Sequence, residues 1–313
     1  MFVWMKTTLR PWQQVLTVLL GLALVGCVAP TSKTHVDTRG PEDWIAWQAK
    51  RRESVAGTNG WTTVVGLHWL KEGRNSAGSS PTNDVVLTSS GVRAHVGWFV
   101  RAGLFVRFEP AQALGAAVDG KPVPTSGVDL ESDANSKPSV LVLDDIRIVV
   151  LKRGERLGLR VRDAQSAARL GFRGLALFPY DPAWRKEGRF EPARGGETLR
   201  VRDVIGGVQE YQVPGRFVFS HAGVEHRLVA VEEPGEEELF VIFRDATAGD
   251  TTYAAGRFLY VAKPDASGRV ILDFNRSYTP PCGFTPFATC PLPPKENLLS
   301  IAIMAGEKKP LGH

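Results

Sequence analysis

The sequence has few cysteines and none of the common catalytic signatures. Its 313 residues include three cysteines and six histidines. They lack the Gly-X-Ser-X-Gly elbow of serine hydrolases, the Walker loop of nucleotide triphosphatases, and a Gly-X-Gly-X-X-Gly turn between a strand and a helix. Beyond the N-terminal region, no apolar run is long enough to cross a membrane. We therefore expect no cofactor and no metal centre, and motifs alone assign no enzyme class.

The charge of the chain gives little indication of a partner. There are 38 basic and 33 acidic residues, a net charge of +5, and the two signs are interspersed without a basic stripe. This pattern does not favour nucleic acid as a partner. The hydrophobic content of 43% is that of a packed globular protein, and the length suits two small domains or one large β domain.

The N-terminus carries an export signal. Lys6 and Arg10 precede an apolar run, residues 15–25, that is too short to span a bilayer but suits a signal peptide. The run ends in Leu24-Val25-Gly26-Cys27, which resembles the lipobox of bacterial lipoproteins. This resemblance implies cleavage before Cys27 and attachment of lipid, such as palmitate, to that residue. The alternative is an ordinary signal peptide in which Cys27 lies near the cleavage site by chance.

The lipobox also predicts a location. Val28 rather than Asp follows the lipidated cysteine, and by resemblance to lipoprotein sorting this favours the outer membrane, facing the periplasm. Acyl chains on Cys27 would make the membrane the protein's first partner. Removing residues 1–26 lowers the net charge to +3, because that segment contains two basic residues and no acid. Residues 27–39 are polar and aperiodic, as expected of a tether.

One helix is predicted, over residues 40–57. Pro41 and the two acids that follow it are typical of a first helical turn, and Gly57 of a helix end. Trp44 and Trp47 share a face of this helix. We expect the pair to anchor the helix on a β core, the alternative being a platform for a ligand.

The rest of the chain predicts a mostly β fold. Short segments rich in β-branched and aromatic residues alternate with turn residues such as Asp119-Gly120, Asp144-Asp145 and Arg153-Gly154. We expect a β-sandwich over residues 58–163, a connection over 164–196, and a C-terminal antiparallel sheet or barrel with a proline-rich loop over 197–308. The predicted strands are 85–87, 92–100, 104–108, 140–143, 146–151, 157–161, 198–204, 216–219, 226–231, 239–243, 258–261 and 270–274.

Residues 75–123 resemble a forkhead-associated domain. The resemblance lies in the segments 75–79, 83–87, 92–95 and 119–123, and it implies a β-sandwich shape. Where that family holds phosphothreonine with an Arg and a Ser, this chain has Ser79 and Val92. Because Ser cannot replace the bidentate guanidinium, we expect no phosphothreonine binding.

A more extensive resemblance covers the C-terminal half. Its motifs include Arg244-Asp245-Ala246-Thr247, Gly256-Arg257-Phe258-Leu259-Tyr260, Asp273-Phe274-Asn275-Arg276, Pro280-Pro281-Cys282 and Ala305-Gly306-Glu307-Lys308. They resemble the family known as domain of unknown function number sixteen eighty-four, with likeness extending back to about Trp61. The resemblance implies a bacterial, often exported family whose densest motifs lie over residues 244–308. It implies no activity.

Two cysteines remain after lipidation. Cys282 and Cys290 flank a proline-rich loop, and in an oxidising compartment such a pair is expected to form a disulfide. The alternatives are two free thiols or a metal site. A metal site would need two more ligands, and no His lies nearby along the chain.

A zinc site of the metalloprotease kind is not supported. His221 and the pair Glu225-His226 have the wrong spacing, and they fall in a Gly-containing hairpin rather than on one face of a helix.

The C-terminal motifs concentrate polar side chains in strand ends and loops, and they are the candidate ligand-binding residues. Guanidinium groups there could hold a carboxylate or phosphate, and carboxyl and amide groups could orient a sugar hydroxyl or a water. The alternative is structural, with the acids bonding local backbone and pairing with the arginines. The candidates are Arg244, Asp245, Thr247, Tyr253, Arg257, Asp273, Asn275, Arg276 and Tyr278, with Glu307 and Lys308 as further members.

Three functions are consistent with these observations. The first is a monomeric, lipid-anchored binding module for a small anionic or sugar-like ligand of the cell envelope. The second is an envelope hydrolase that uses Asp245 or Asp273 as its base. The third is a purely structural lipoprotein. A polar pocket containing the candidate arginines would favour the first two.

Overall fold

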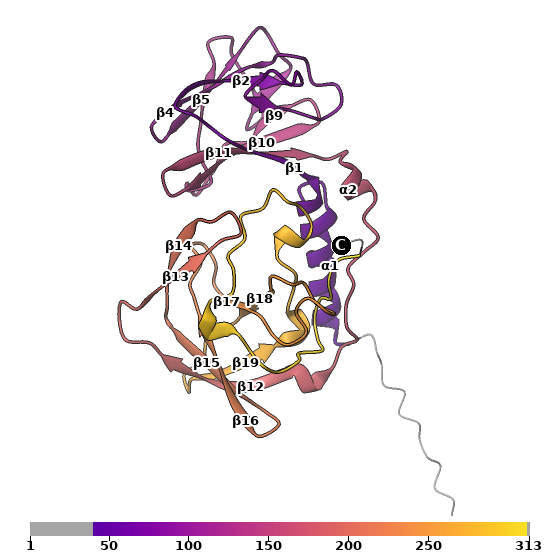
Figure 1. Ribbon diagram of the computed structural model, residues 1–313, viewed down its shortest axis with the longest axis vertical. Helices are drawn as coiled ribbons and strands as arrows, with labels where there is room; N and C mark the ends of the chain where they lie inside the picture. The colour runs from indigo at the N-terminus through magenta and orange to yellow at the C-terminus, as the bar shows by residue number, and fades with distance from the viewer. Residues whose placement is uncertain (1–39, 312–313) are drawn as a thin grey trace, which may run out of the picture. The chain divides into compact units, whose positions relative to one another are not determined.

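A computed structural model describes residues 40–311 of the chain (Figure 1). The predicted signal peptide, the lipidation site Cys27 and the tether lie outside the described residues. The fold is mostly β, as predicted, with several sheets and one long helix near the N-terminus. No helix in the described part of the chain is both long and apolar enough to cross a bilayer.

The predicted helix is confirmed as α1, Glu42–Ala56. It starts directly after Pro41 with two acids in its first turn, where they complement the helix dipole. It ends at Gly57, whose N–H donates to the Glu53 carbonyl at 2.8 Å. Trp44 is buried, and its indole nitrogen donates to the Asn275 carbonyl at 3.0 Å. The helix is therefore anchored to the C-terminal part of the chain through this tryptophan.

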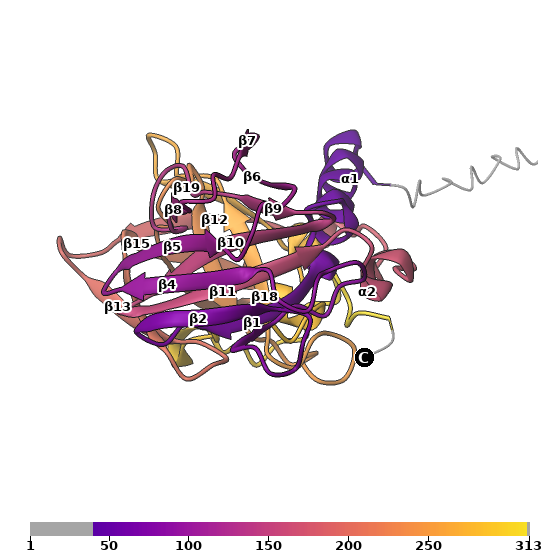
Figure 2. The same cartoon turned by 90° about the horizontal axis from the view of Figure 1, so that it is seen from above.

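The N-terminal strands form two sheets around one core (Figure 2). Phe99 and Phe108 from one sheet pack in the same cluster as Ile148 and Leu159 from the other, and burial of such side chains stabilises the fold by about 1.5–3 kcal/mol each. A β-sandwich is thus formed. One sheet has the order β3 (Val85–Val86), β2 (Gly73–Gly78), β4 (Gly97–Ala102), β5 (Phe105–Pro110) and β8 (Val128–Leu130). The other has the order β1 (Val64–Trp69), β11 (Arg156–Asp163), β10 (Ile146–Arg153), β9 (Leu141–Leu143), β6 (Ala116–Val118) and β7 (Lys121–Pro122).

The tight turns follow the sequence. Asp119 and Gly120 have φ angles of 50° and 79°, the left-handed pair that a type I′ hairpin between β6 and β7 requires. Asp144, at φ 50°, opens the two-residue turn between β9 and β10.

The C-terminal strands form a four-stranded sheet and two hairpins. In the described residues these sheets stay open and do not close into a barrel. The sheet has the order β16 (Val224–Ala230), β15 (Gly215–His221), β12 (Arg185–Pro192) and β19 (Arg269–Asp273). The hairpins are β13 (Thr198–Arg202) with β14 (Val208–Gln212), and β17 (Leu239–Phe243) with β18 (Arg257–Val261). Short helical segments complete the chain: α2 (Ala167–Leu170), η1 (Trp61–Thr63), η2 (Pro182–Trp184), η3 (Phe274–Arg276), η4 (Pro281–Gly283) and η5 (Lys295–Asn297).

The hairpin β17–β18 separates two cores. Leu259 and Val261 of β18 point into one cluster, together with Leu239 and Val241 of β17. Because successive side chains of a strand point to opposite faces, the residues between them point into the second cluster. That second face carries Phe240, Phe258 and Tyr260.

Strand β12 falls inside the segment expected to connect two domains. Residues 164–196 carry few apolar runs, yet β12 pairs with β15 on one side and β19 on the other. Its sequence is Arg-Lys-Glu-Gly-Arg-Phe-Glu-Pro, and the exposed and partly buried positions alternate. One face of this central strand carries charged side chains that are exposed to solvent. Hydrophobicity alone therefore does not identify residues 185–192 as a strand.

The proline-rich loop contacts the sandwich. The Thr285 hydroxyl donates to the Val64 carbonyl of β1 at 2.9 Å, and the Arg153 Nε donates to the Thr289 hydroxyl at 3.2 Å. The loop therefore lies against β1 and the end of β10.

Candidate functional site

The predicted site residues belong to two separate networks. In the first, Arg257 and Asp245 form a fully buried ion pair, with 3.1 Å between Nη2 and Oδ1. Arg257 also donates to the Ile303 and Ala305 carbonyls. Asp245 accepts from the Ile303 N–H at 2.7 Å and from the Thr247 hydroxyl at 2.8 Å. Both charged groups thereby hold the C-terminal segment, although the Arg257 Nε has no acceptor among the described residues.

The second network secures helix α1. Asp273 accepts from the Asn275 amide at 2.9 Å and lies 3.4 Å from the Arg276 Nε, whose guanidinium also pairs with Asp43. The completely buried Asn275 exchanges two hydrogen bonds of 2.9 Å with the backbone of Asp181. Within the described residues, no hydrogen bond or salt bridge joins Arg257 to Asp273, Asn275 or Arg276, so the predicted cluster is divided between two networks.

The remaining candidates are dispersed. Arg244 is exposed, and the backbone around it bonds to residues 297–299. The Tyr253 hydroxyl donates to the Cys282 carbonyl at 3.1 Å. Glu307 pairs with Arg51 of α1, with 2.6 Å between Oε1 and Nε. Tyr278 is the one predicted residue that lines the cavity described next.

A cavity of about 510 Å³ opens among α1, β10–β11, the hairpin β17–β18 and the proline-rich loop. We call it the aromatic cavity, because six of its lining side chains are aromatic: Trp47, Trp61, Phe240, Phe258, Tyr260 and Tyr278. Its charged lining residues are Arg51, Arg153, Arg160 and Glu233. Its volume suits a small ligand.

Strand alternation places Arg160 at this cavity. Leu157, Leu159 and Val161 of β11 point into the sandwich core. Arg160 therefore points to the opposite face of the sheet, where its guanidinium lies 4.9 Å from the centroid of the Trp61 ring. The sequence of β11 thus directs a positive charge away from the core and into the aromatic cavity.

Arg160 differs from the other arginines of the cavity in having no carboxylate partner. Arg153 pairs with Asp133 at 2.8 Å, and Arg51 pairs with Glu307. Within residues 40–311, no salt bridge involves Arg160 and no acceptor reaches its buried Nε. Burial and the nearby charges of Arg153 and Arg162 lower the pKa of Arg160 to about 10, which leaves it charged at neutral pH. A partly buried cation without a carboxylate partner is unfavourable, and an anionic ligand would compensate its charge.

The lining of the aromatic cavity also contains hydroxyl and carboxyl groups, from Tyr260, Tyr278 and Glu233. The Tyr260 hydroxyl donates to the Glu233 carboxyl group. Burial raises the pKa of Glu233, and the hydrogen bond from Tyr260 only partly opposes this effect. The pKa of Tyr278 is also raised, mainly by burial. The cavity therefore combines a cationic side, formed by Arg160, with a side of hydroxyl and carboxyl groups.

The two cysteines meet at the wall of the cavity. Cys290 lines it, and its sulfur accepts from the Cys282 N–H at 3.1 Å. Both are free thiols in the structure, so the expected disulfide is not formed there. The Cys290 thiol hydrogen-bonds to Cys282 and lowers its pKa, while this bond and burial raise the pKa of Cys290.

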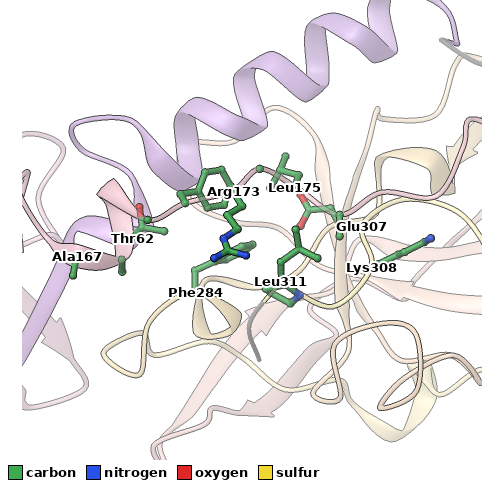
Figure 3. A pocket seen from close by; sticks show the side chains of 14 residues that line it. Thr62, Ala167, Arg173, Leu175, Phe284, Glu307, Lys308 and Leu311 are labelled. Carbon is green, nitrogen blue, oxygen red and sulfur yellow. The ribbon is translucent and has the colours of Figure 1, made fainter.

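A second cavity, of about 410 Å³, lies beside α2 and the C-terminal segment (Figure 3). Its charged lining residues are Arg173, Glu307 and Lys308. Glu307 is neutralised by Arg51, and the Lys308 amine lies 4.7 Å from the centroid of the Phe178 ring. Figure 3 shows the guanidinium of Arg173 beside Phe284 and the Lys308 amine pointing away from the other labelled side chains. Because Arg173 is exposed, this cavity offers less specific chemistry than the aromatic cavity.

Comparisons with known proteins identify the family. Residues 170–308 match the family described as "Protein of unknown function (DUF1684)", and the chain belongs to this family. The match begins at residue 170. The likeness that we expected to extend back to about Trp61 is therefore not part of the match. The resemblance of residues 75–123 to a forkhead-associated domain is not confirmed.

Solved structures also include similar chains. One is an uncharacterised protein of Haloarcula marismortui, determined by NMR in solution, with 32% sequence identity and a TM-score of 0.39. The alignment covers 46% of this chain and 81% of that chain. A comparison with curated proteins found no match.

Proposed function

We propose that the protein is a lipid-anchored binding module of the cell envelope, and that the aromatic cavity binds a small anionic ligand. The observation that carries the proposal is Arg160, a charged group that faces the cavity without a carboxylate partner among residues 40–311. A guanidinium binds carboxylate or phosphate with two parallel hydrogen bonds, and these bonds are strong where water is largely excluded.

The walls of the aromatic cavity indicate the rest of the ligand. Trp47 and Trp61 offer flat apolar surfaces, and Tyr260 and Tyr278 add further rings whose centroids lie 6.3 Å apart. Such surfaces pack against a ring, either aromatic or the C–H face of a sugar. The ligand class supported best is therefore an anion with a ring-shaped body.

The two alternative functions have less support. A hydrolase that uses Asp245 or Asp273 would need one of these carboxylates at a cavity. Asp245 is buried among its partners, and Asp273 holds Asn275 and Arg276. Neither lines the aromatic cavity. A purely structural role would account for the stacking of Arg160 on Trp61 but not for the missing carboxylate partner of its guanidinium.

The location in the envelope and the redox state of the cysteines complete the proposal. The lipobox at residues 24–27 supports an anchor in the outer membrane, and this location exposes the domain to an oxidising periplasm.

In the periplasm, Cys282 and Cys290 would form the disulfide, because their thiols already lie next to each other. Mass spectrometry of the exported protein, alkylated before and after reduction, tests this. Two alkylated thiols in the unreduced, denatured protein would contradict it.

The binding proposal is tested by titration calorimetry with benzoate, phenyl phosphate and galacturonate. We expect at least one of these anions to bind the wild type, and Arg160→Gln to weaken that binding at least tenfold. Arg147→Gln is the matched control. It removes the same charge from the neighbouring strand β10 but lies outside the aromatic cavity. Absence of binding to every probe, or equal loss in both variants, would contradict the proposal.

A further inference from the structure

The aromatic cavity adjoins a further cavity, of about 540 Å³, that lies between β10–β11 and the hairpin β13–β14. We call this further cavity the polar groove. The two spaces share four lining residues: Arg153, Glu233, Thr289 and Pro291. A third space, of about 350 Å³, shares Gln209, Tyr211, Glu233 and Pro234 with the polar groove. Glu233 therefore lies where all three meet.

The lining changes character along this path. The aromatic cavity is lined largely by rings, whereas the polar groove presents planar polar side chains such as Gln209 and Tyr211 of β14. Among residues 40–311, no hydrogen bond involves the side chain of Gln209, which is exposed, or of Tyr211, which is 4% exposed. Polar groups that are free along a groove remain available to a ligand.

The charged residues beside Gln209 and Tyr211 form their hydrogen bonds with other groups. Asp203, which also lines the polar groove, accepts from the N–H groups of Ile205 and Gly207 and so shapes the turn before β14. Arg153 is held by Asp133 and Thr289. On the β14 side, the polar groove thus keeps free hydrogen-bonding capacity.

We propose that the ligand is the end of an acidic oligosaccharide: its terminal acidic sugar enters the aromatic cavity and the following sugars lie along the polar groove. This inference rests on the proposed function of the aromatic cavity and adds the chemical class and length of the ligand. A sugar chain fits both parts, because its rings present C–H faces to aromatic side chains and hydroxyl groups to planar polar ones. Its acidic group pairs with Arg160.

An acidic peptide would make fewer favourable contacts with the aromatic cavity than an acidic oligosaccharide. It would also satisfy Arg160, but it gains little from the flat faces of Trp47 and Trp61 unless it carries rings itself. The hydroxyl and carboxyl pair of Tyr260 and Glu233 both donates and accepts while Glu233 is protonated, which matches sugar hydroxyls. Peptides therefore serve as the comparison in the experiment.

The experiment measures binding as a function of chain length. Galacturonate and its linear oligomers of two to five units are titrated into the wild-type protein, with oligoglutamates of the same lengths as charge-matched peptides. We expect the affinity for the sugar series to rise at least tenfold from one unit to three, and the peptide series to gain clearly less. The double variant Gln209→Ala, Tyr211→Phe should lose this gain and keep the affinity for the single sugar. Arg160→Gln should weaken every member of the sugar series.

The outcomes separate the two proposals. Affinity for galacturonate that does not rise with length, or rises equally for the peptides, overturns the oligosaccharide inference and leaves the anion site intact. Binding of benzoate or phenyl phosphate without any binding of galacturonate does the same. If no anion binds, or if Arg160→Gln changes nothing, both proposals fail. Urea unfolding of each variant checks that it is folded before binding is compared.

Discussion

Arg51 and Glu307 lie 256 positions apart in the sequence and form a buried salt bridge, with 2.6 Å between Nε and Oε1. The Arg51 guanidinium also donates to the Thr279 carbonyl and stacks 4.5 Å above the centroid of the Tyr278 ring. A helix close to the start of the domain is thereby fixed to its last segment, and the same arginine forms part of the aromatic cavity.

Two ion pairs at opposite ends of α1 are predicted to have very different effects on stability. Arg51→Met leaves the Glu307 carboxylate buried without its partner, and we expect a loss of about 3–5 kcal/mol in the free energy of unfolding. Arg276→Met breaks the pair with Asp43, whose side chain is 70% exposed, and a longer pair of 3.4 Å with Asp273, which keeps its hydrogen bond from Asn275; it should cost about 1 kcal/mol. Urea unfolding of both variants measures the difference. Equal losses would show that the buried pair is not the principal attachment of the helix.

Asp245 is predicted to stabilise the fold rather than to act as a catalytic base. Asp245→Ala leaves the guanidinium of Arg257 buried without a carboxylate, because the side chains of both residues are almost completely inaccessible. We expect a loss of about 3–5 kcal/mol in the free energy of unfolding. Circular dichroism with urea measures it. A variant of wild-type stability would contradict this interpretation and reopen the hydrolase alternative.

Much of the fold could be predicted from local patterns. The acidic first turn and Gly57 mark the two ends of α1. Asp119-Gly120 marks a hairpin, because both residues readily adopt the left-handed backbone that the turn requires. Both signals depend only on neighbouring residues. Strand β12 was not predicted, since its charged sequence becomes a central strand only through pairing with β15 and β19. Such pairing connects distant segments and leaves no mark in the local composition.

The site was harder to predict than the fold. The motif-rich residues Asp245, Arg257 and Asn275 are buried and hold the chain together. The residues that line the aromatic cavity come from α1, β11 and β18, and only the tertiary fold brings them together. One signal was present in the sequence: the alternation of Leu157, Leu159 and Val161 with Arg160 and Arg162 shows two arginines on the face opposite the core.

Lipidation of Cys27 remains a prediction, because this residue lies outside the described part of the chain. In a host grown with labelled palmitate, the wild type should carry label and fractionate with membranes, since the lipobox directs acylation of that cysteine. Cys27→Ser should carry none. Equal labelling of both proteins, or a soluble wild type, would remove the anchor and the proposed location.

The last prediction concerns Glu233 and pH. Its pKa is raised above its ordinary value of 4.5 in the folded protein, chiefly by burial, so the folded state retains a proton that the unfolded chain releases. Wherever the folded state binds more protons, stability falls as pH rises. The contribution of Glu233 is therefore fully present below about pH 4.5 and is lost as pH rises through the folded-state pKa. Glu233→Gln keeps an acceptor for the Tyr260 hydroxyl but cannot titrate, so the variant should become more stable relative to the wild type between pH 4 and pH 8. Urea unfolding at four pH values in that range measures the difference, and parallel curves for the two proteins would contradict the prediction.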